Sequence, residues 1–368
     1  MFNIPEKGKD ISGCAIVGMM SVEGRMASGR KVISAIANMH ERSNGLGGGF
    51  AAYGIYPEFS SQYALHIMFE TPLAQRQTRD YLDANALVRH DEPIPTRPLE
   101  VIKNRPILHR YFIDIREDVR RQYYDLSEDD IIVKLVMEIN RTMGGAFVFS
   151  SGRNMGVFKG VGYPEDIGEF YRLDEYEAYI WTAHGRFPTN TTGWWGGAHP
   201  FGLLDWSVVH NGEISSYGIN RRYLGNYGYE CLLHTDTEVI AYMFDLLVRK
   251  HKMPLELACV AMAPPFYQKI EKMAPDDAAV VKAIRMVYGG ALLNGPFSVA
   301  VATRKMMMGF NDRIKLRPMW VASKDDMRYI ASEEAAIRVI EPNPDRVWMA
   351  RGGEPVIFTL ENAEVVHA

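Results

Sequence analysis

Hydrophobic patterns along the chain predict strands in the first half, helices in the middle and strands again at the end. Short apolar runs rich in β-branched and aromatic residues, bounded by turn residues, are typical of buried strands. Such runs lie at residues 14–20, 50–56, 63–69, 146–150, 155–159, 179–183 and 207–210, and at least four more are expected within 297–366. The runs at 146–150 and 155–159 flank Gly152 and resemble a hairpin.

Helical spacing of apolar residues appears in three places. Residues 29–42 put Val32, Ile36 and Met39 on one face. A second helix is expected from Ser127, a capping residue followed by three acids, and more helices are expected within 237–288. Strands, helices and strands in that order favour an α+β fold in which helices pack against antiparallel sheets.

One segment interrupts these patterns. Three prolines within residues 91–98 argue against regular structure there. The segment is either a domain linker or, in the interpretation we favour, a surface loop within an insertion.

Composition narrows the class of protein. Of 368 residues 47% are apolar and 23% charged, which excludes disorder and coiled coil as the main state. The net charge of −4 lacks the basic footprint of a nucleic-acid binder. No apolar stretch reaches the ~18 residues of a membrane span, and the first ten residues do not resemble a secretory signal. We therefore expect a cytoplasmic protein without nucleic-acid or membrane partners.

The motifs of several common chemistries are missing from the sequence. Three cysteines form neither a disulfide framework nor a zinc-type spacing, and the histidines lack HExxH, so no metal site is expected. No GxSxG elbow is present, and Gly47-Gly48-Gly49 precedes a strand, as in a flexible turn.

One region, residues 184–238, is dense in polar motifs. Taken singly, each has a structural explanation: Arg186 as a surface ion pair, Asn211-Gly212 as a hairpin turn, and Thr235 or Asp236 as a helix cap. Together they provide a guanidinium for a carboxylate, a carboxylate for an ammonium, and an amide beside a glycine N–H. That set suits an α-amino acid whose side-chain carbonyl is attacked.

Motifs in collinear order from Cys14 to about residue 340 resemble those of class II glutamine amidotransferases, which are N-terminal-nucleophile hydrolases. They are Cys-Ala-Ile-Val-Gly at 14–18, His-Gly-Arg-Phe-Pro-Thr at 184–189, Ala-His-Pro-Phe at 198–201, His-Asn-Gly-Glu at 210–213, Thr-Asp-Thr-Glu at 235–238, Gly-Pro-Phe-Ser at 295–298, Asp-Arg-Ile-Lys-Leu-Arg-Pro-Met at 312–319 and Ala-Ser-Glu at 331–333. The set is most similar to the glutaminase part of glutamate synthases. The resemblance implies a four-layer αββα sandwich over residues 14–368, with an insertion around 70–125.

The resemblance also implies a role for each of seven residues. Cys14 would be the nucleophile, Asn211 and Gly212 the oxyanion hole, Arg186 and Asp236 the clamps for the glutamine α-carboxylate and α-ammonium, and Thr189 and Asn190 part of a lid over the substrate.

Two departures from the family pattern stand out. Ala15 replaces the usual glycine after the nucleophile, which is tolerable only where the backbone needs neither positive φ nor close approach. Cys14 is also not the first residue, although the family mechanism uses the free α-amine of the cysteine as general base. We therefore expect residues 1–13 to be a propeptide; the alternative is an unprocessed, non-catalytic regulatory subunit.

The ammonia acceptor is not encoded by any motif of this chain. It has no SGGxDS-type loop for ATP and no flavin or iron–sulfur signature. We expect no cofactor in this chain, and a separate synthase subunit, of the glutamate synthase kind, that carries FMN and iron–sulfur clusters. The alternative enzyme is a subunit of N-methylglutamate synthase or of another amide-using synthase.

Overall fold

Two antiparallel sheets form the centre of the molecule in the computed structural model, which describes residues 13–187 and 193–360. The larger sheet has the order β17-β15-β16-β1-β10-β3-β8, and the smaller one has the order β11-β12-β13-β14-β18. The larger sheet comprises β1 (Ala15–Ser21), β3 (Gly48–Tyr53), β8 (Met155–Gly160), β10 (Ile180–Gly185), β15 (Trp320–Lys324), β16 (Met327–Ala331) and β17 (Arg346–Met349). The smaller comprises β11 (Phe201–Leu203), β12 (Trp206–Gly212), β13 (Phe297–Thr303), β14 (Met306–Asn311) and β18 (Val356–Thr359).

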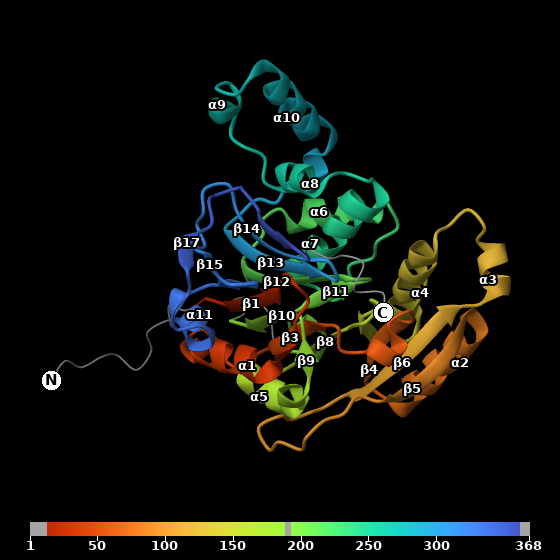
Figure 1. Cartoon of the computed structure of the whole chain (residues 1–368). Helices are drawn as coiled ribbons and strands as arrows, with labels where there is room; N and C mark the ends of the chain where they lie inside the picture. The colour runs from red at the N-terminus through yellow and green to blue at the C-terminus, as the bar shows by residue number, and fades with distance from the viewer. Residues whose placement is uncertain (1–12, 188–192, 361–368) are drawn as a thin grey trace, which may run out of the picture.

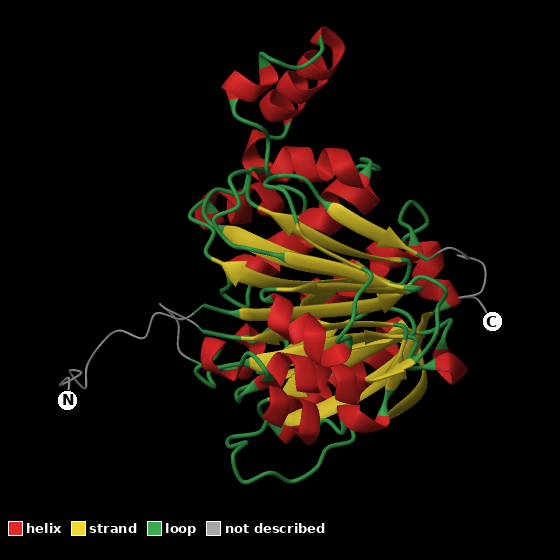
Figure 2. Ribbon diagram, turned by 60° about the vertical axis from the view of Figure 1, so that its left-hand side comes forward, coloured by secondary structure: helices red, strands yellow, loops and turns green. Residues whose placement is uncertain are grey.

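Helices cover the outer face of each sheet. On the larger sheet lie α1 (Gly29–Ala37), α5 (Pro164–Phe170) and α11 (Glu334–Ile340). On the smaller side lie α6 (Tyr217–Gly225), α7 (Asp236–Phe244), which continues as a π-helical turn at Asp245–Lys250, and α8 (Leu255–Met262). Figure 2 shows the strands stacked between these helices. The predicted αββα sandwich is confirmed.

A third sheet with the order β5-β6-β4-β7 lies at one side of the sandwich (Figure 1). Its strands are β4 (Tyr63–Phe69), β5 (Ala86–Pro93), β6 (Ile107–Ile115) and β7 (Ala146–Ser150), and its helices are α2 (Pro72–Asn85), α3 (Glu117–Gln122) and α4 (Glu128–Thr142). Residues 70–125 therefore supply two of its four strands. That they are an insertion stays a prediction.

A helical arm projects from the molecule beyond α8, at the top of Figure 1. It is formed by α9 (Tyr267–Ile270) and α10 (Pro275–Val287), with a small apolar cluster of its own around Ile270 and Val281. The two-residue strands β2 (Ala27–Ser28) and β9 (Glu177–Ala178) pair with each other beside α1.

Three local predictions are wrong. The strands around Gly152 do not form a hairpin, because β7 pairs with β4 in the third sheet and β8 pairs with β3 in the larger sheet. Residues 91–93 belong to β5, an edge strand in which Pro93 is the last residue, so the irregular segment begins at Ile94. The helix predicted over 29–42 ends at Ala37, and a separate 3-10 turn follows at His40–Arg42.

Candidate active site

Cys14 directly precedes β1, a central strand of the larger sheet whose seven residues are all buried. The strand is fastened at this end by Ser332: the Ile16 N–H donates to Ser332 Oγ at 3.1 Å, and the Ser332 N–H donates to the Ile16 carbonyl at 3.0 Å. Ser332 belongs to the Ala-Ser-Glu motif, so that motif holds the strand that carries the cysteine.

Ala15 fits its position without strain. It is a β-strand residue, is not among the residues with positive φ, and pairs with Gly185 on β10. A Cβ on Gly185 would stand 3.5 Å from the Ala15 methyl, which is ordinary van der Waals contact. The backbone at position 15 therefore needs neither positive φ nor close approach, and the methyl group of alanine is tolerated there.

The Cys14 sulfur accepts a hydrogen bond from the Phe187 N–H at 3.3 Å. Burial raises the pKa of the thiol, whereas the Phe187 N–H and the positive charges of Arg186 and Arg317 act against this and Asp236 adds to it. The thiol is therefore protonated at neutral pH, and a nucleophilic role requires a base. Among the described residues no titratable side chain hydrogen-bonds to the sulfur.

Arg42 holds the backbone of the cysteine. Its Nε and Nη2 each donate to the Cys14 carbonyl at 3.2 Å, and its Nη1 donates to Glu333 at 2.8 Å. No motif of the sequence marks Arg42 as a site residue. An indirect signal exists, because Glu333, the partner of Arg42, stands in the Ala-Ser-Glu motif.

Asn211 and Gly212 end β12, opposite Ser298 and Phe297 on β13. Asn211 is buried, and within the described chain neither its Oδ1 nor its Nδ2 has a hydrogen-bond partner. A Cβ on Gly13 would lie 3.7 Å from this Oδ1, so the amide lies beside the residue that precedes Cys14. A buried amide without partners is costly, and binding a ligand removes that cost.

Gly212 has a φ of 150°, and a Cβ there would overlap the Pro296 carbonyl oxygen. The position therefore accepts glycine only. The reason is not a hairpin turn, because Gly212 lies in a strand whose neighbouring backbone approaches closely.

Arg186 is not a surface ion pair. It is 6% exposed and follows β10, where its N–H donates to the Gly47 carbonyl at 2.8 Å and its own carbonyl accepts from Asn44 N–H at 3.3 Å and Ser43 Oγ at 3.1 Å. Burial lowers the pKa of the guanidinium, and the proximity of Cys14 and Asp236 works in the opposite direction. The charge therefore lies in the same buried site as the sulfur.

Asp236 is the first residue of α7, and the capping role belongs to its neighbour Thr235, whose Oγ1 accepts from Thr237 N–H at 3.2 Å. Asp236 Oδ2 accepts from the Ile214 N–H at 2.9 Å. Burial alone would raise the pKa of this carboxyl, but His210, Ile214 and Thr237 together hold the pKa below its ordinary value. The carboxylate is thus ionised and available to a cation.

The loop after Asp312 brings a further positive charge, that of Arg317, close to the cysteine. The Asp312 carboxylate accepts from the N–H groups of Phe297 at 3.2 Å, Ile314 at 3.0 Å and Leu316 at 2.9 Å, and so shapes the loop that carries Arg317. A Cβ on Gly13 would lie 3.2 Å from Arg317 Nη1. The Asp-Arg-Ile-Lys-Leu-Arg-Pro-Met motif therefore places the positive charge of Arg317, a residue that the resemblance left without a role, near the Cys14 thiol.

The structure thus brings five predicted site residues to one place, where β1 begins and β10 and β12 end: Cys14, Arg186, Asn211, Gly212 and Asp236. Thr189 and Asn190 lie outside the described residues, as do residues 1–12 of the predicted propeptide. Gly13 is described and lies within the cluster, against Arg42, Arg317 and Asn211.

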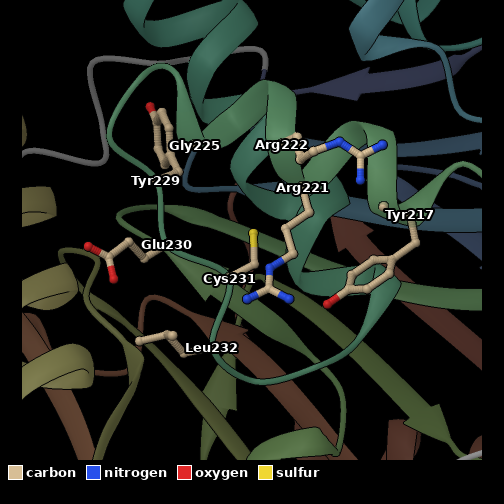
Figure 3. Close-up of a pocket in the computed structure, with 9 residues that line it drawn as sticks. Tyr217, Arg221, Arg222, Gly225, Tyr229, Glu230, Cys231 and Leu232 are labelled. Atoms are coloured by element: carbon tan, nitrogen blue, oxygen red, sulfur yellow. The ribbon is translucent and has the colours of Figure 1, made fainter.

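The other two cysteines are buried away from this cluster. Burial raises the pKa of both thiols. Cys231 lines a cavity of about 360 Å³ beside α6, together with Tyr217 and Arg221 (Figure 3).

Over the described ranges no helix has the length and apolar character needed to span a bilayer, and no three His, Cys, Asp or Glu side chains are grouped as metal ligands.

Comparisons with known proteins find one matching family model and several relatives. The family model "Glutamine amidotransferases class-II" matches residues 94–227, which include Arg186, Asn211 and Gly212. The chain is 50% identical to an uncharacterized protein of Archaeoglobus fulgidus, over 97% of this chain and 94% of that one. It is 22% identical to a putative glutamine amidotransferase of Methanothermobacter thermautotrophicus, over 89% and 93% of the two chains. It is 24% identical to the glutamate synthase [NADPH] large chain of Bacillus subtilis, over 72% of this chain but only 18% of the relative. The chain therefore contains a class II glutamine amidotransferase region, matched over residues 94–227.

Proposed function

We propose that this chain is a glutaminase subunit that hydrolyses glutamine to glutamate and ammonia through a thioester on Cys14. The observation that carries the proposal is the buried Asn211 amide, which has no hydrogen-bond partner among the described residues. It lies beside the residue that precedes Cys14, with Arg186 and Asp236 in the same site. An α-amino acid presents a carboxylate to the arginine, an ammonium to the aspartate and an amide carbonyl to the asparagine.

In the proposed reaction the Cys14 sulfur attacks the side-chain amide carbon of glutamine. The thiol proton passes to the α-amine of Cys14 and from there to the departing nitrogen, which leaves as ammonia. Asn211 Nδ2 and the Gly212 N–H would stabilise the oxyanion, each contributing about 3–4 kcal/mol to transition-state binding. Water then attacks the thioester and releases glutamate and the thiol.

The general base in this proposal requires cleavage between Gly13 and Cys14. While Gly13 is attached, the cysteine nitrogen is an amide and cannot accept the proton, and burial keeps the thiol protonated. Removal of residues 1–13 would create an α-amine with a pKa of about 8 at the sulfur and would vacate the space beside Asn211 and Arg317. Thr189 and Asn190, three and four residues after Arg186, would close over the bound glutamine.

The ammonia acceptor is proposed to be a separate synthase subunit of the glutamate synthase kind. The 24% identity to a glutamate synthase large chain supports this assignment. FMN and iron–sulfur clusters would then belong to the partner, and this chain would need no cofactor. The three free cysteines fit a reducing compartment such as the cytoplasm.

The test compares the full chain, a chain that begins at Cys14, and Cys14→Ala in the shorter chain. We expect intact mass to show loss of residues 1–13 in active material, and only chains with a free Cys14 amine to release ammonia from glutamine. Activity of the full-length chain with Gly13 still attached, or of Cys14→Ala, would contradict the mechanism. A folded shorter chain that binds no glutamine would favour the regulatory alternative.

A further inference from the structure

A second cavity, of about 570 Å³, lies where the third sheet meets the main sandwich. Its walls come from the end of β4 (Met68, Glu70), from the loop before β6 (Lys103, Arg105) and from Trp194, which follows the proposed lid. Its volume falls within the range of small-molecule sites, about 300–1,000 Å³.

The charges around this cavity favour an anion. Lys103 and Arg105 are exposed, and neither forms an ion pair with another residue of the described chain. Glu70 is the one acid among the lining residues, so two cations face one carboxylate. The remaining lining is mostly apolar or aromatic: the Trp194 and Phe147 rings meet edge to face with centroids 5.4 Å apart.

The cavity shares its walls with the segments that hold Arg186. Gly45, which lines it, lies between Asn44 and Gly47, whose backbones hydrogen-bond to Arg186. On the other wall, a Cβ on Gly197 would lie 2.6 Å from Trp194 Nε1 and 3.3 Å from Arg186 Nη1. Only a glycine therefore separates the indole from the guanidinium.

We propose that this cavity binds a small organic anion with an aromatic body, and that its occupant tightens the hold of Arg186 on glutamine. The aromatic body would lie against Trp194 and Phe147, and the phosphate or carboxylate would lie at Lys103 and Arg105. An occupant fixes the 43–47 and 193–197 segments in the arrangement that positions Arg186, so the entropy cost of ordering them is met before glutamine binds. The effect on glutamine rests on the proposed function, whereas the binding site does not.

Binding is tested by calorimetry on the full chain with AMP and indole-3-acetate as probes for a phosphate and a carboxylate. Adenosine and indole-3-acetamide are the matched neutral probes. We expect at least one anion to bind at least about tenfold more tightly than its neutral counterpart. The double substitution Lys103→Glu with Arg105→Glu should remove that preference, while Lys282→Glu on the exposed face of α10 should keep it. The site is overturned if neither anion binds, or if the double variant binds as the unmodified chain does.

Coupling is tested on the chain that begins at Cys14. A saturating anion should lower the KM for glutamine about fivefold, and saturating glutamine should tighten anion binding by a similar factor. Lys103→Glu with Arg105→Glu should leave the KM measured without anion unchanged and abolish the effect of the anion. Anion binding with an unchanged or raised KM would overturn the coupling while leaving the site in place. A chain without glutaminase activity that still binds the anion would count against the proposed function alone.

Discussion

Replacement of Gly212 by alanine adds one methyl group at the point where the proposed oxyanion hole is closest to its neighbouring strand. The new Cβ would overlap the Pro296 carbonyl oxygen and would lie 2.8 Å from Phe297 Cα and 2.9 Å from His210 Nε2. Two of these neighbours are backbone atoms, of Pro296 just before β13 and of Phe297 at its start, and they cannot rotate away as a flexible side chain can. The φ of 150° is also one that alanine rarely adopts.

The end of β12 must therefore shift by a large part of an ångström. A shift of this size removes the Gly212 N–H from the oxyanion and moves Asn211, which precedes it on the strand. Loss of one oxyanion donor costs about 3–4 kcal/mol, or a factor of 10²–10³ in kcat. Backbone strain adds about 1–3 kcal/mol to the loss of folding stability.

The assay measures ammonia release at saturating glutamine, together with a thermal melt, on chains that begin at Cys14. Gly225→Ala is the matched control, because a Cβ there meets nothing within 4 Å and the residue ends α6. The control should retain full activity and lose no stability, since alanine favours the helix by about 0.5–1 kcal/mol. A Gly212→Ala chain with kcat within about twofold of the unmodified enzyme would refute the reasoning.

Two further predictions concern buried charges. Asp236→Asn should raise the KM for glutamine about tenfold or more, because it removes a charge-assisted contact of roughly 1.5–3 kcal/mol. Arg186→Lys should also be poorly tolerated, because an ammonium cannot reproduce the planar two-point contact of a guanidinium with a carboxylate. Steady-state kinetics beside a melting curve measure both effects, and an unchanged KM in both variants would show that the glutamine site is misplaced. The second prediction concerns Lys159, whose Nζ donates to the Gly196 carbonyl at 2.9 Å and whose pKa burial lowers to about 7. Between pH 7 and pH 9 the unfolded chain keeps the lysine proton that the folded chain releases, so folding stability rises with pH in this window. Relative to Lys159→Met, the unmodified chain should gain about 2–3 kcal/mol of unfolding free energy from pH 7 to pH 9, at ~1.4 kcal/mol per pKa unit. Denaturant melts at both pH values measure this, with Lys282→Met as the control, and parallel curves for the unmodified chain and Lys159→Met would contradict it.

Local patterns predicted most of the strands well. The run at 63–69 coincides with β4, and the apolar run that follows Cys14 is β1. Ser127 caps α4 as expected, with its Oγ accepting from the Asp130 N–H at 3.1 Å. These features succeed because strand periodicity and helix capping depend on residues only a few positions apart.

Strand pairing was less predictable. Nothing within β7 or β8 specifies that they join different sheets, because a buried apolar run fits any partner of suitable length. The neighbours of β1 lie at residues 180–185 and 327–331, far away along the chain. Only the closed packing of the two sheets decides which of these runs lie side by side.

In the candidate site, too, the sequence predicted some features and the tertiary structure decided others. The collinear motifs of the sequence name Cys14, Arg186, Asn211, Gly212 and Asp236, and the family resemblance gives each a role. Motifs alone left Arg186 open as a surface ion pair and Gly212 as a turn residue; both alternatives fail because burial and close strand approach are properties of the assembled sandwich.

The supporting residues were decided by tertiary structure alone. Arg42 reaches the Cys14 carbonyl across 28 positions, and Ser332 reaches Ile16 across 316. Such contacts carry no periodicity and no local spacing, so no pattern in the sequence predicts them. The chain by itself determined which chemical groups are available and which segments form strands. The sandwich determined which of those groups lose water, approach one sulfur atom and act together, because burial and proximity arise only when distant segments pack.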